Sequence, residues 1–203
     1  VKTYSDHIGV PIVLIDDGKD ETLNEGSALW TRIPKDVTAE QYKEFYHHVG
    51  HVFDEPWKVL HNRVEGVLAY TNLLFIPSTA PFDLFDPERK PRVKLYVKRV
   101  FITDDCEALL PPYLRFVRGI VDSEDLSLNI SREMLQKDPK LAKIKAGLVK
   151  RILGELKKAA DKEPESYATF WKAFGAVLKE GLYEDFSNRD ALLPLCRFDS
   201  TGD

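Results

Sequence analysis

The segment from Asp122 to Gln136 reads Asp-Ser-Glu-Asp-Leu-Ser-Leu-Asn-Ile-Ser-Arg-Glu-Met-Leu-Gln. It predicts a loop with alternating apolar residues that leads into a helix. Ser131 is a suitable N-cap, because its hydroxyl can accept a hydrogen bond from an amide of the first turn. Arg132 then falls at the helix start, where the dipole favours anions and a guanidinium adds a fixed positive charge. This combination suits a phosphate group; the alternative is a surface arginine paired with a nearby acid.

The residues before this segment predict an α/β layer. Thr38 and Gln41 have the spacing of a capping box, and the helix that follows is expected to end with Gly50 in a left-handed conformation. Runs of β-branched and aromatic residues, and then alternating apolar and polar residues, predict strands. The expected strands cover 64–77 and 93–102, and a helix or helical turn is expected over 113–120.

The residues after the segment predict helices. Asp138-Pro139 supplies an N-cap followed by proline at the first helical position, and Pro164 opens a second helix. A short third helix is expected over 188–193, limited by Pro194. Apolar residues mark one face of each long helix: Leu141, Ile144, Leu148, Ile152 and Leu156 on the first, and Tyr167, Phe170, Trp171, Phe174, Val177 and Leu178 on the second. The prediction is an α/β (α+β) layered domain followed by a C-terminal helical hairpin or three-helix bundle.

The N-terminal residues have a different character. A short aliphatic run over 10–15 predicts a strand, whereas 16–27 is acidic, contains two glycines and predicts a flexible linker. The α/β domain is therefore expected to occupy 28–137 and the helical segment 138–203.

Composition excludes several classes of protein. With 43% hydrophobic and 31% charged residues, the 203-residue chain is expected to be globular and soluble. A net charge of -4 argues against a general nucleic-acid binder, and no apolar run is long enough to predict a membrane span. Cys106 and Cys196 are far apart in the sequence and are expected to be reduced thiols.

Several stretches together resemble the heat shock protein 90 chaperones. The segment Asp122–Gln136 closely resembles the catalytic loop of that family's middle domain. Further matching stretches are Leu29-Trp30-Thr31-Arg32 and those at 62–66, 80–85, 95–102, 114–119 and 195–198. The amino-acid sequence of residues 4–9 is more similar to the bacterial members of the family (the high-temperature protein G type). The lack of a long charged linker points to the same members.

The resemblance implies a fold and a set of partners. It implies a ribosomal protein S5 domain 2-like fold, with residues 1–15 as the end of a preceding N-terminal ATP-binding domain and a dimerisation domain beyond residue 203. ATP and Mg²⁺ would be held mainly by that N-terminal domain, and none is expected in this segment. The other implied partners are unfolded or partly folded clients and a second copy in a cytoplasmic homodimer, without nucleic acid or membrane.

The resemblance also assigns roles to residues. Arg132 would reach the γ-phosphate of ATP held by the neighbouring domain, and Gln136, at i+4 on the same helical face, would support it. Full-length protein would be an ATPase, whereas this segment alone is expected to be inactive. Residues expected to support ATP binding are Asn129 and Ser131. Those expected to dock the nucleotide domain are Phe101, Leu126 and Leu128; core packing is the alternative for all three and explains Phe101 better than docking does.

A separate loop carries apolar residues between two prolines. Phe82, Leu84 and Phe85 follow Pro81 and precede Pro87, which predicts a loop offering client-binding surface, with burial of the rings as the alternative. Phe53 and Trp57 are expected to extend this surface.

Two other interpretations remain open from the sequence. His47, His48 and His51 are close enough to suggest a metal site, but a solvated helix end explains them better. The alternative to an ATPase segment is a non-catalytic protein-interaction module.

Overall fold

The structure is a computed structural model that describes residues 10–16, 19–24, 26, 28–86, 91–104, 106–128 and 132–198, with only the backbone of Asp16 and Arg132. Its centre is a five-stranded mixed sheet in the order β3-β4-β7-β5-β6. The bounds are Pro56–Val64 for β3, Tyr70–Pro77 for β4, Arg92–Val97 for β5, Val100–Thr103 for β6 and Arg118–Ser123 for β7. Only β5 and β7 are parallel; the other pairs are antiparallel. The mixed sheet confirms the predicted α/β layer.

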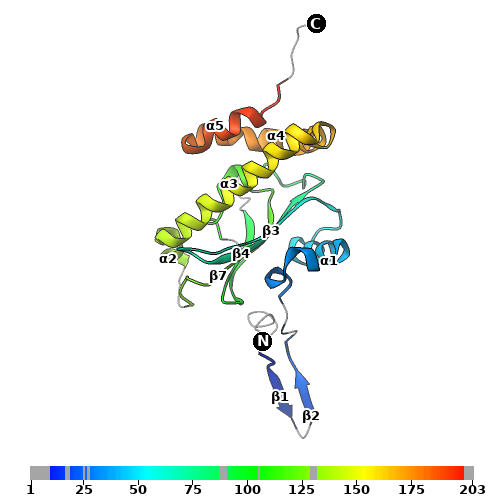
Figure 1. Ribbon diagram of the computed structural model, residues 1–203, viewed down its shortest axis with the longest axis vertical. Coiled ribbons are helices and arrows are strands. Elements are labelled where there is room, and N and C mark those ends of the chain that lie inside the picture. Colours follow the sequence, from blue (N-terminus) through cyan, green and yellow to red (C-terminus); the bar gives the residue numbers. More distant parts are fainter. Residues whose placement is uncertain are drawn as a thin grey trace.

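Helices cover both faces of the sheet, as Figure 1 shows. Helix α1 (Ala39–Gly50) covers one face, where Trp30, Tyr46 and Phe75 belong to a small buried cluster. Helices α3 (Pro139–Lys162) and α4 (Pro164–Glu184) cover the other face with a larger core. The short helix α2 (Arg132–Lys137) precedes α3.

The helical segment forms as its periodicity predicts. The side chain of Asp138 accepts hydrogen bonds from the amides of Lys140 and Leu141, so it caps α3 as expected. The predicted apolar faces of α3 and α4 are buried except for Trp171, which is half-buried. A short helix α5 (Arg189–Leu192) follows and runs into a 3-10 turn over Leu193–Leu195 that contains Pro194, as predicted.

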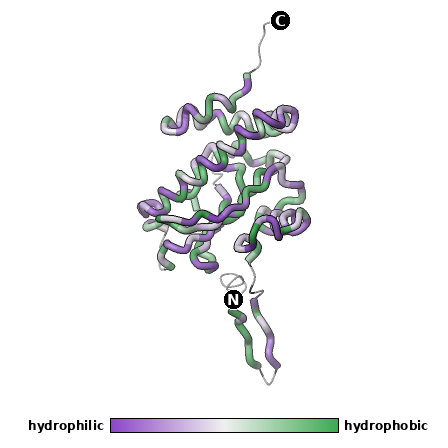
Figure 2. Tube along the Cα trace, viewed as in Figure 1, coloured by the Kyte–Doolittle hydropathy of each residue, from purple (hydrophilic) through white to green (hydrophobic). Residues whose placement is uncertain are grey.

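The strand expected over 10–15 forms, and a second strand pairs with it within the residues expected to be a linker. β1 (Val13–Asp16) pairs with β2 (Lys19–Thr22), and the pair projects away from the sheet in Figure 1. Figure 2 shows β1 as hydrophobic and β2 as hydrophilic. Every residue of β2 is exposed, so the strand has no alternating burial pattern from which it could be predicted.

Three further predictions on the sheet domain are corrected. Helix α1 begins at the predicted capping box, but the left-handed residue that ends it is His51, at φ 50°, and not Gly50. The single strand expected over 64–77 is the end of β3, a turn and β4. The single strand expected over 93–102 is a hairpin whose two-residue turn, Lys98-Arg99, has positive φ at both positions without glycine.

The segment 113–120 also differs from its prediction. Only Pro112–Leu114 forms a 3-10 turn, and the chain then enters β7, the central strand of the sheet. Gly119 in this strand has φ 128°, and a Cβ there would collide with the backbone of Leu73 and lie 2.9 Å from the Cα of Leu74. The close approach of β4 to β7 therefore requires glycine at this position.

Candidate functional site

The loop between β7 and α2 is held at its start by hydrogen bonds. The hydroxyl oxygen of Ser123 accepts from the amides of Asp125 and Leu126, both at 3.2 Å. The carboxylate of Asp125 in turn accepts from the amide of Ala69 at 2.6 Å, which ties the loop to the β3–β4 turn. Leu126 is 3% exposed and lies in the main core. The chain therefore leaves the sheet along a defined path before it reaches Leu128.

The far end of the loop is also anchored. Arg132 is the first residue of α2, as predicted, and Leu135 in the same helix is 4% exposed. The ammonium group of Lys140 in α3 donates to the backbone carbonyl of Asp125 at 2.8 Å, so the two ends are joined directly. Buried leucines and this hydrogen bond thus fix both ends of the segment that contains Arg132.

Not every predicted phosphate-site residue is described. Asn129 and Ser131 lie outside the described residues, and only the backbone of Arg132 is described. Gln136 is exposed and lines a cavity of about 350 Å³. The other lining residues are Glu107, Ala108, Leu135, Asp138, Ala142 and Lys145.

A buried carboxylate lies at the base of the loop. The side chain of Asp122, at the end of β7, accepts hydrogen bonds from the indole of Trp30 at 2.8 Å and the amide of Arg99 at 3.1 Å. Burial raises the pKa of the Asp122 carboxyl, and these two donors oppose the rise. The carboxylate links the segment before α1, the β5–β6 turn and the strand that enters the loop.

Only one of the three residues predicted to dock a nucleotide domain has an exposed side chain. Leu128 is 48% exposed. Phe101 is half-buried and meets Tyr96 edge to face at 5.6 Å. Leu126, for which docking was expected, instead fits the core-packing alternative, because the turn held by Ser123 directs its side chain into the core.

The loop over 78–86 is held by a second carboxylate. One oxygen of Asp54 accepts from the hydroxyl of Tyr46 at 2.9 Å, and the other accepts from the amides of Ser78 and Thr79 at 3.2 Å. Further along, Leu84 is 1% exposed, and its carbonyl accepts from Arg115 Nε at 2.8 Å.

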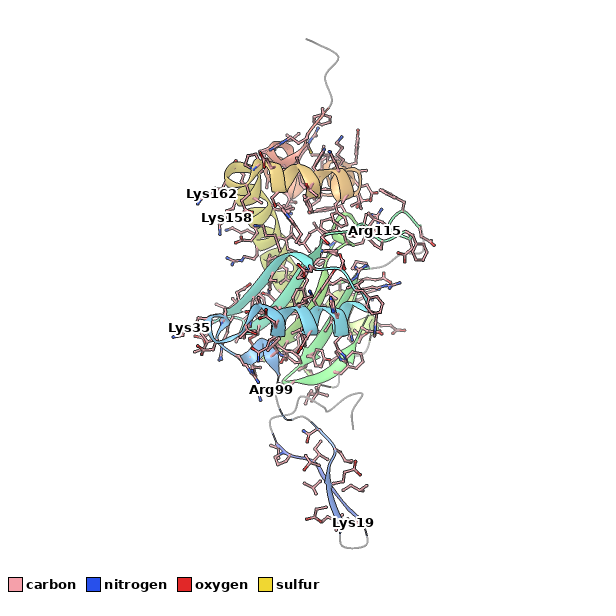
Figure 3. All side chains as sticks on the ribbon, turned by 90° about the vertical axis from the view of Figure 1, so that its right-hand side faces the viewer. Lys19, Lys35, Arg99, Arg115, Lys158 and Lys162 are labelled. Atoms are coloured by element: carbon pink, nitrogen blue, oxygen red, sulfur yellow. The ribbon has the colours of Figure 1, made fainter. Side chains whose placement is uncertain are left out.

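Arg115 also fixes this loop to the helical layer. Its guanidinium makes two hydrogen bonds to the carboxylate of Glu180 in α4, one of them at 2.9 Å. Figure 3 shows Arg115 between the sheet and the helices. Local sequence patterns do not reveal Asp54, Asp122 and Arg115, because the partners of these side chains lie 8 to 92 positions away in the chain.

The predicted client-binding residues separate into exposed and buried groups. Phe53 is 95% exposed, Phe85 is 59% exposed and Phe82 is fully exposed. Leu84 was also expected to contribute to this surface, but this prediction is wrong, because Leu84 lies in the core. Trp57 is half-buried, stacks on Phe170 at 4.6 Å and donates to the hydroxyl of Ser166 at 2.7 Å.

Neither a metal site nor a membrane span emerges from the described residues. His47 bonds the backbone carbonyl of Asp54 at 2.8 Å, and the described side chains form no group of three or more metal-ligating residues. None of the helices in the described ranges is both long and apolar enough to cross a membrane.

Comparison with known proteins decides the family. The sequence profile described as "Hsp90 protein" matches residues 1–203. The chain belongs to the Hsp90 family. It is 65% identical over 202 residues to the "Chaperone protein HtpG" of Paramagnetospirillum magneticum and 62% identical over 201 residues to that of Roseobacter denitrificans, covering 99% of this chain in both cases. The chain spans about a third, 32%, of the length of these Hsp90 relatives.

A solved structure of a similar protein confirms the fold. The middle domain of a putative heat shock protein of Plasmodium falciparum superposes with a TM-score of 0.74 at 30% sequence identity, covering 84% of this chain and 66% of that chain. The predicted Hsp90-type layered domain with C-terminal helices is therefore confirmed, and the chain corresponds to the middle domain of a bacterial-type Hsp90 chaperone.

Proposed function

We propose that this middle domain supplies Arg132 to the γ-phosphate of ATP bound by a neighbouring domain of the same chain. The guanidinium would offset charge that develops on the transferring phosphoryl group, as an arginine finger does. The observation that carries the proposal is that Arg132 begins a helix whose loop is anchored at both ends by Leu126 and Leu135. Such anchoring would limit the reorganisation needed when the arginine meets phosphate.

The groups at this helix fit the phosphate end of the nucleotide. Arg132 offers a forked cation, and the exposed Gln136 lies one turn further along. We propose that Gln136 donates to a phosphate oxygen or supports Arg132, with Asn129 and Ser131 orienting the loop. Mg²⁺ and the rest of ATP would be held by the N-terminal domain, which Leu128 and the half-buried Phe101 would contact.

Full-length protein with Arg132→Ala tests this assignment. ATP turnover should fall at least about tenfold, whereas nucleotide affinity should stay within about twofold, since the arginine acts on the phosphate only after the domains close. Arg189→Ala, which removes an exposed arginine from α5, is the matched control and should leave both quantities unchanged. Unchanged turnover in the Arg132 variant would contradict the proposal.

We also propose that Phe53, Phe82 and Phe85 form a client-binding patch. Buried anchors hold the loop of Phe82 and Phe85, so the exposed rings are not a consequence of a loose chain. Aromatic rings exposed on loops offer apolar contact area to unfolded chains. Chaperoning in a cytoplasmic homodimer, assembled through a domain outside this chain, completes the proposed function.

The patch can be tested separately from the arginine. Serine at all three positions should weaken binding of reduced, carboxymethylated α-lactalbumin by at least about fivefold, measured by fluorescence anisotropy. Serine at the exposed Tyr183 and Phe186 is the matched control and should change little. Loss of client binding in the triple variant, together with normal turnover in Arg132→Ala, would favour the non-catalytic interaction module instead.

A further inference from the structure

A groove on the helical face of the sheet has no part in the proposed roles of Arg132 and the aromatic patch. It lies between the β3–β4 pair and helix α3 and has a volume of about 490 Å³, within the usual range of ligand sites. Its lining residues are Asn62, Val64, Tyr70, Asn72, Gly147, Lys150, Arg151, Gly154, Glu155 and Lys158. In Figure 3 the lining residue Lys158 is labelled to the left of Arg115.

Two glycines shape the helical wall of the groove. A Cβ at Gly154 would meet no atom within 4 Å, so the space beside it is empty of protein. A Cβ at Gly147 would lie 2.5 Å from the hydroxyl of Tyr70, so the glycine lets Tyr70 approach the helix. The two positions are seven residues apart, which corresponds to about 10 Å along a helix, or about three residues of extended chain.

The floor of the groove holds hydrogen-bond acceptors without donors. Asn62 on β3 and Asn72 on β4 are directly opposite in the sheet register, and both side-chain oxygens are buried with no donor among the described residues. The NH₂ group of Asn72 donates to the carbonyl of Leu60 at 3.3 Å, which fixes that amide. Asn62 is half-buried on an edge strand. Rotating its side-chain amide by about 180° around χ2 exchanges the oxygen and the NH₂ group and would turn the oxygen towards the groove. A ligand that brings an N–H donor would then satisfy Asn62, whereas Asn72 is fully buried and is not reached from the groove.

The rim of the groove is positively charged. Arg151 and Lys158 share one acid, Glu155, at 3.5 Å and 2.8 Å. Lys150 is exposed and has no ion-pair partner among the described residues. Three cations thus face one carboxylate, and a ligand with a negative group would be attracted.

We propose that this groove binds an extended, acidic segment of a partner protein, about three residues long. A carboxylate of the segment contacts Lys150, a backbone N–H donates to Asn62, and apolar side chains cover Val64 and Tyr70. A small inorganic anion would lack the donors and the apolar surface, and a basic segment would be repelled. The site is independent of Arg132 and of the aromatic patch, so it goes beyond the proposed function.

Peptide binding to the 203-residue chain tests the proposal. The probe is a fluorescein-labelled hexapeptide of alternating leucine and glutamate, followed by anisotropy. Lys150→Glu should weaken its binding at least about tenfold, and Gly154→Leu should abolish it by filling the groove. Leucine is also a better helix former than glycine, so Gly154→Leu should unfold at the same or a higher temperature. Matched controls on the exposed face of α4, Lys172→Glu and Ala168→Leu, should bind as the wild type does.

Two altered probes test the proposed chemistry. A peptide with lysine in place of glutamate should bind at least tenfold more weakly, and a peptide with methylated backbone nitrogens should lose most of its affinity, because it has no N–H donors. The proposal is overturned if the acidic probe does not bind, if the lysine or methylated peptide binds as tightly, or if folded Gly154→Leu retains wild-type affinity.

Discussion

The two faces of the sheet are stabilised in different ways. The α1 face has a small aromatic cluster linked by polar contacts: the Trp30 indole bonds Asp122, Tyr46 bonds Asp54, and His61 bonds the Trp30 carbonyl at 2.8 Å. The opposite face, under α3 and α4, is a large core of leucine, isoleucine, valine and stacked phenylalanine.

The difference follows from how many helices cover each face. A single twelve-residue helix can bury only a limited apolar area, so directional hydrogen bonds contribute more to order on the α1 face. Two long helices bury a larger apolar area on the other face, so its polar contacts, such as those of Arg115 and Trp57, contribute a smaller share of its stability. Both faces reach the Arg132 loop: the α1 face through the hydrogen bonds of Asp122, and the helical face through the buried Leu126 and Leu135.

The largest expected effect is a cavity in the helical face. Phe174 is fully buried and stacks on Phe116 at 4.7 Å. Phe174→Ala should lower the free energy of unfolding by about 3–5 kcal/mol. The free energy of unfolding is measured by urea denaturation. A loss below about 1 kcal/mol would contradict the view that the helical face is stabilised mainly by apolar packing.

A smaller loss is expected when a bond on the α1 face is removed. Trp30→Phe keeps most of the ring but leaves Asp122 without its indole donor, which should cost about 1–3 kcal/mol. Trp57→Phe removes a similar bond, to the half-buried Ser166 on the helical face, and should cost less. Equal losses in urea denaturation would remove the proposed distinction between the faces.

The α1 face should also respond to pH. Burial lowers the pKa of His61 below 6.5, the value for an exposed histidine, and the bond to Trp30 opposes this. As pH falls below about 6.5 the unfolded chain therefore takes up the proton first, and stability that is present at neutral pH is lost. His61→Gln should reduce the difference in unfolding free energy between pH 7.5 and pH 5.5. An unchanged difference would show that other groups cause it.

The smallest effect is expected at an ion pair between the layers. The ammonium group of Lys58 on β3 contacts both oxygens of Glu163 at 2.7 Å, and both side chains are partly exposed. Lys58→Ala should cost less than about 1 kcal/mol, and the cost should shrink in high salt. A larger loss in urea at low and high salt would mean that polar contacts also matter on the helical face.

The fold could be predicted where one residue pattern determines one element. The apolar face of α3 and its Asp138 cap are local signals, and both were correct. The β5–β6 turn was missed because Lys98 and Arg99 adopt positive φ without the glycine or asparagine that normally marks such a turn. β2 was missed because neither of its faces is buried.

The candidate site was predictable only in its local part. The helix start at Arg132 follows from adjacent residues, whereas the burial of Leu84 depends on packing and on Arg115, 31 positions later. Phe82 and Leu84 look alike in sequence, but one is fully exposed and the other belongs to the core. Single-residue hydrophobicity cannot separate them.

The steric requirement for glycine at position 119 also affects how mutations of this codon would behave in genetics. β7 is the central strand and leads directly to the Arg132 loop, yet any side chain at this position would collide with the neighbouring backbone. Missense alleles of this codon should therefore behave as complete losses of function in a genetic screen. Such alleles could be mistaken for changes in an active site that this residue never touches.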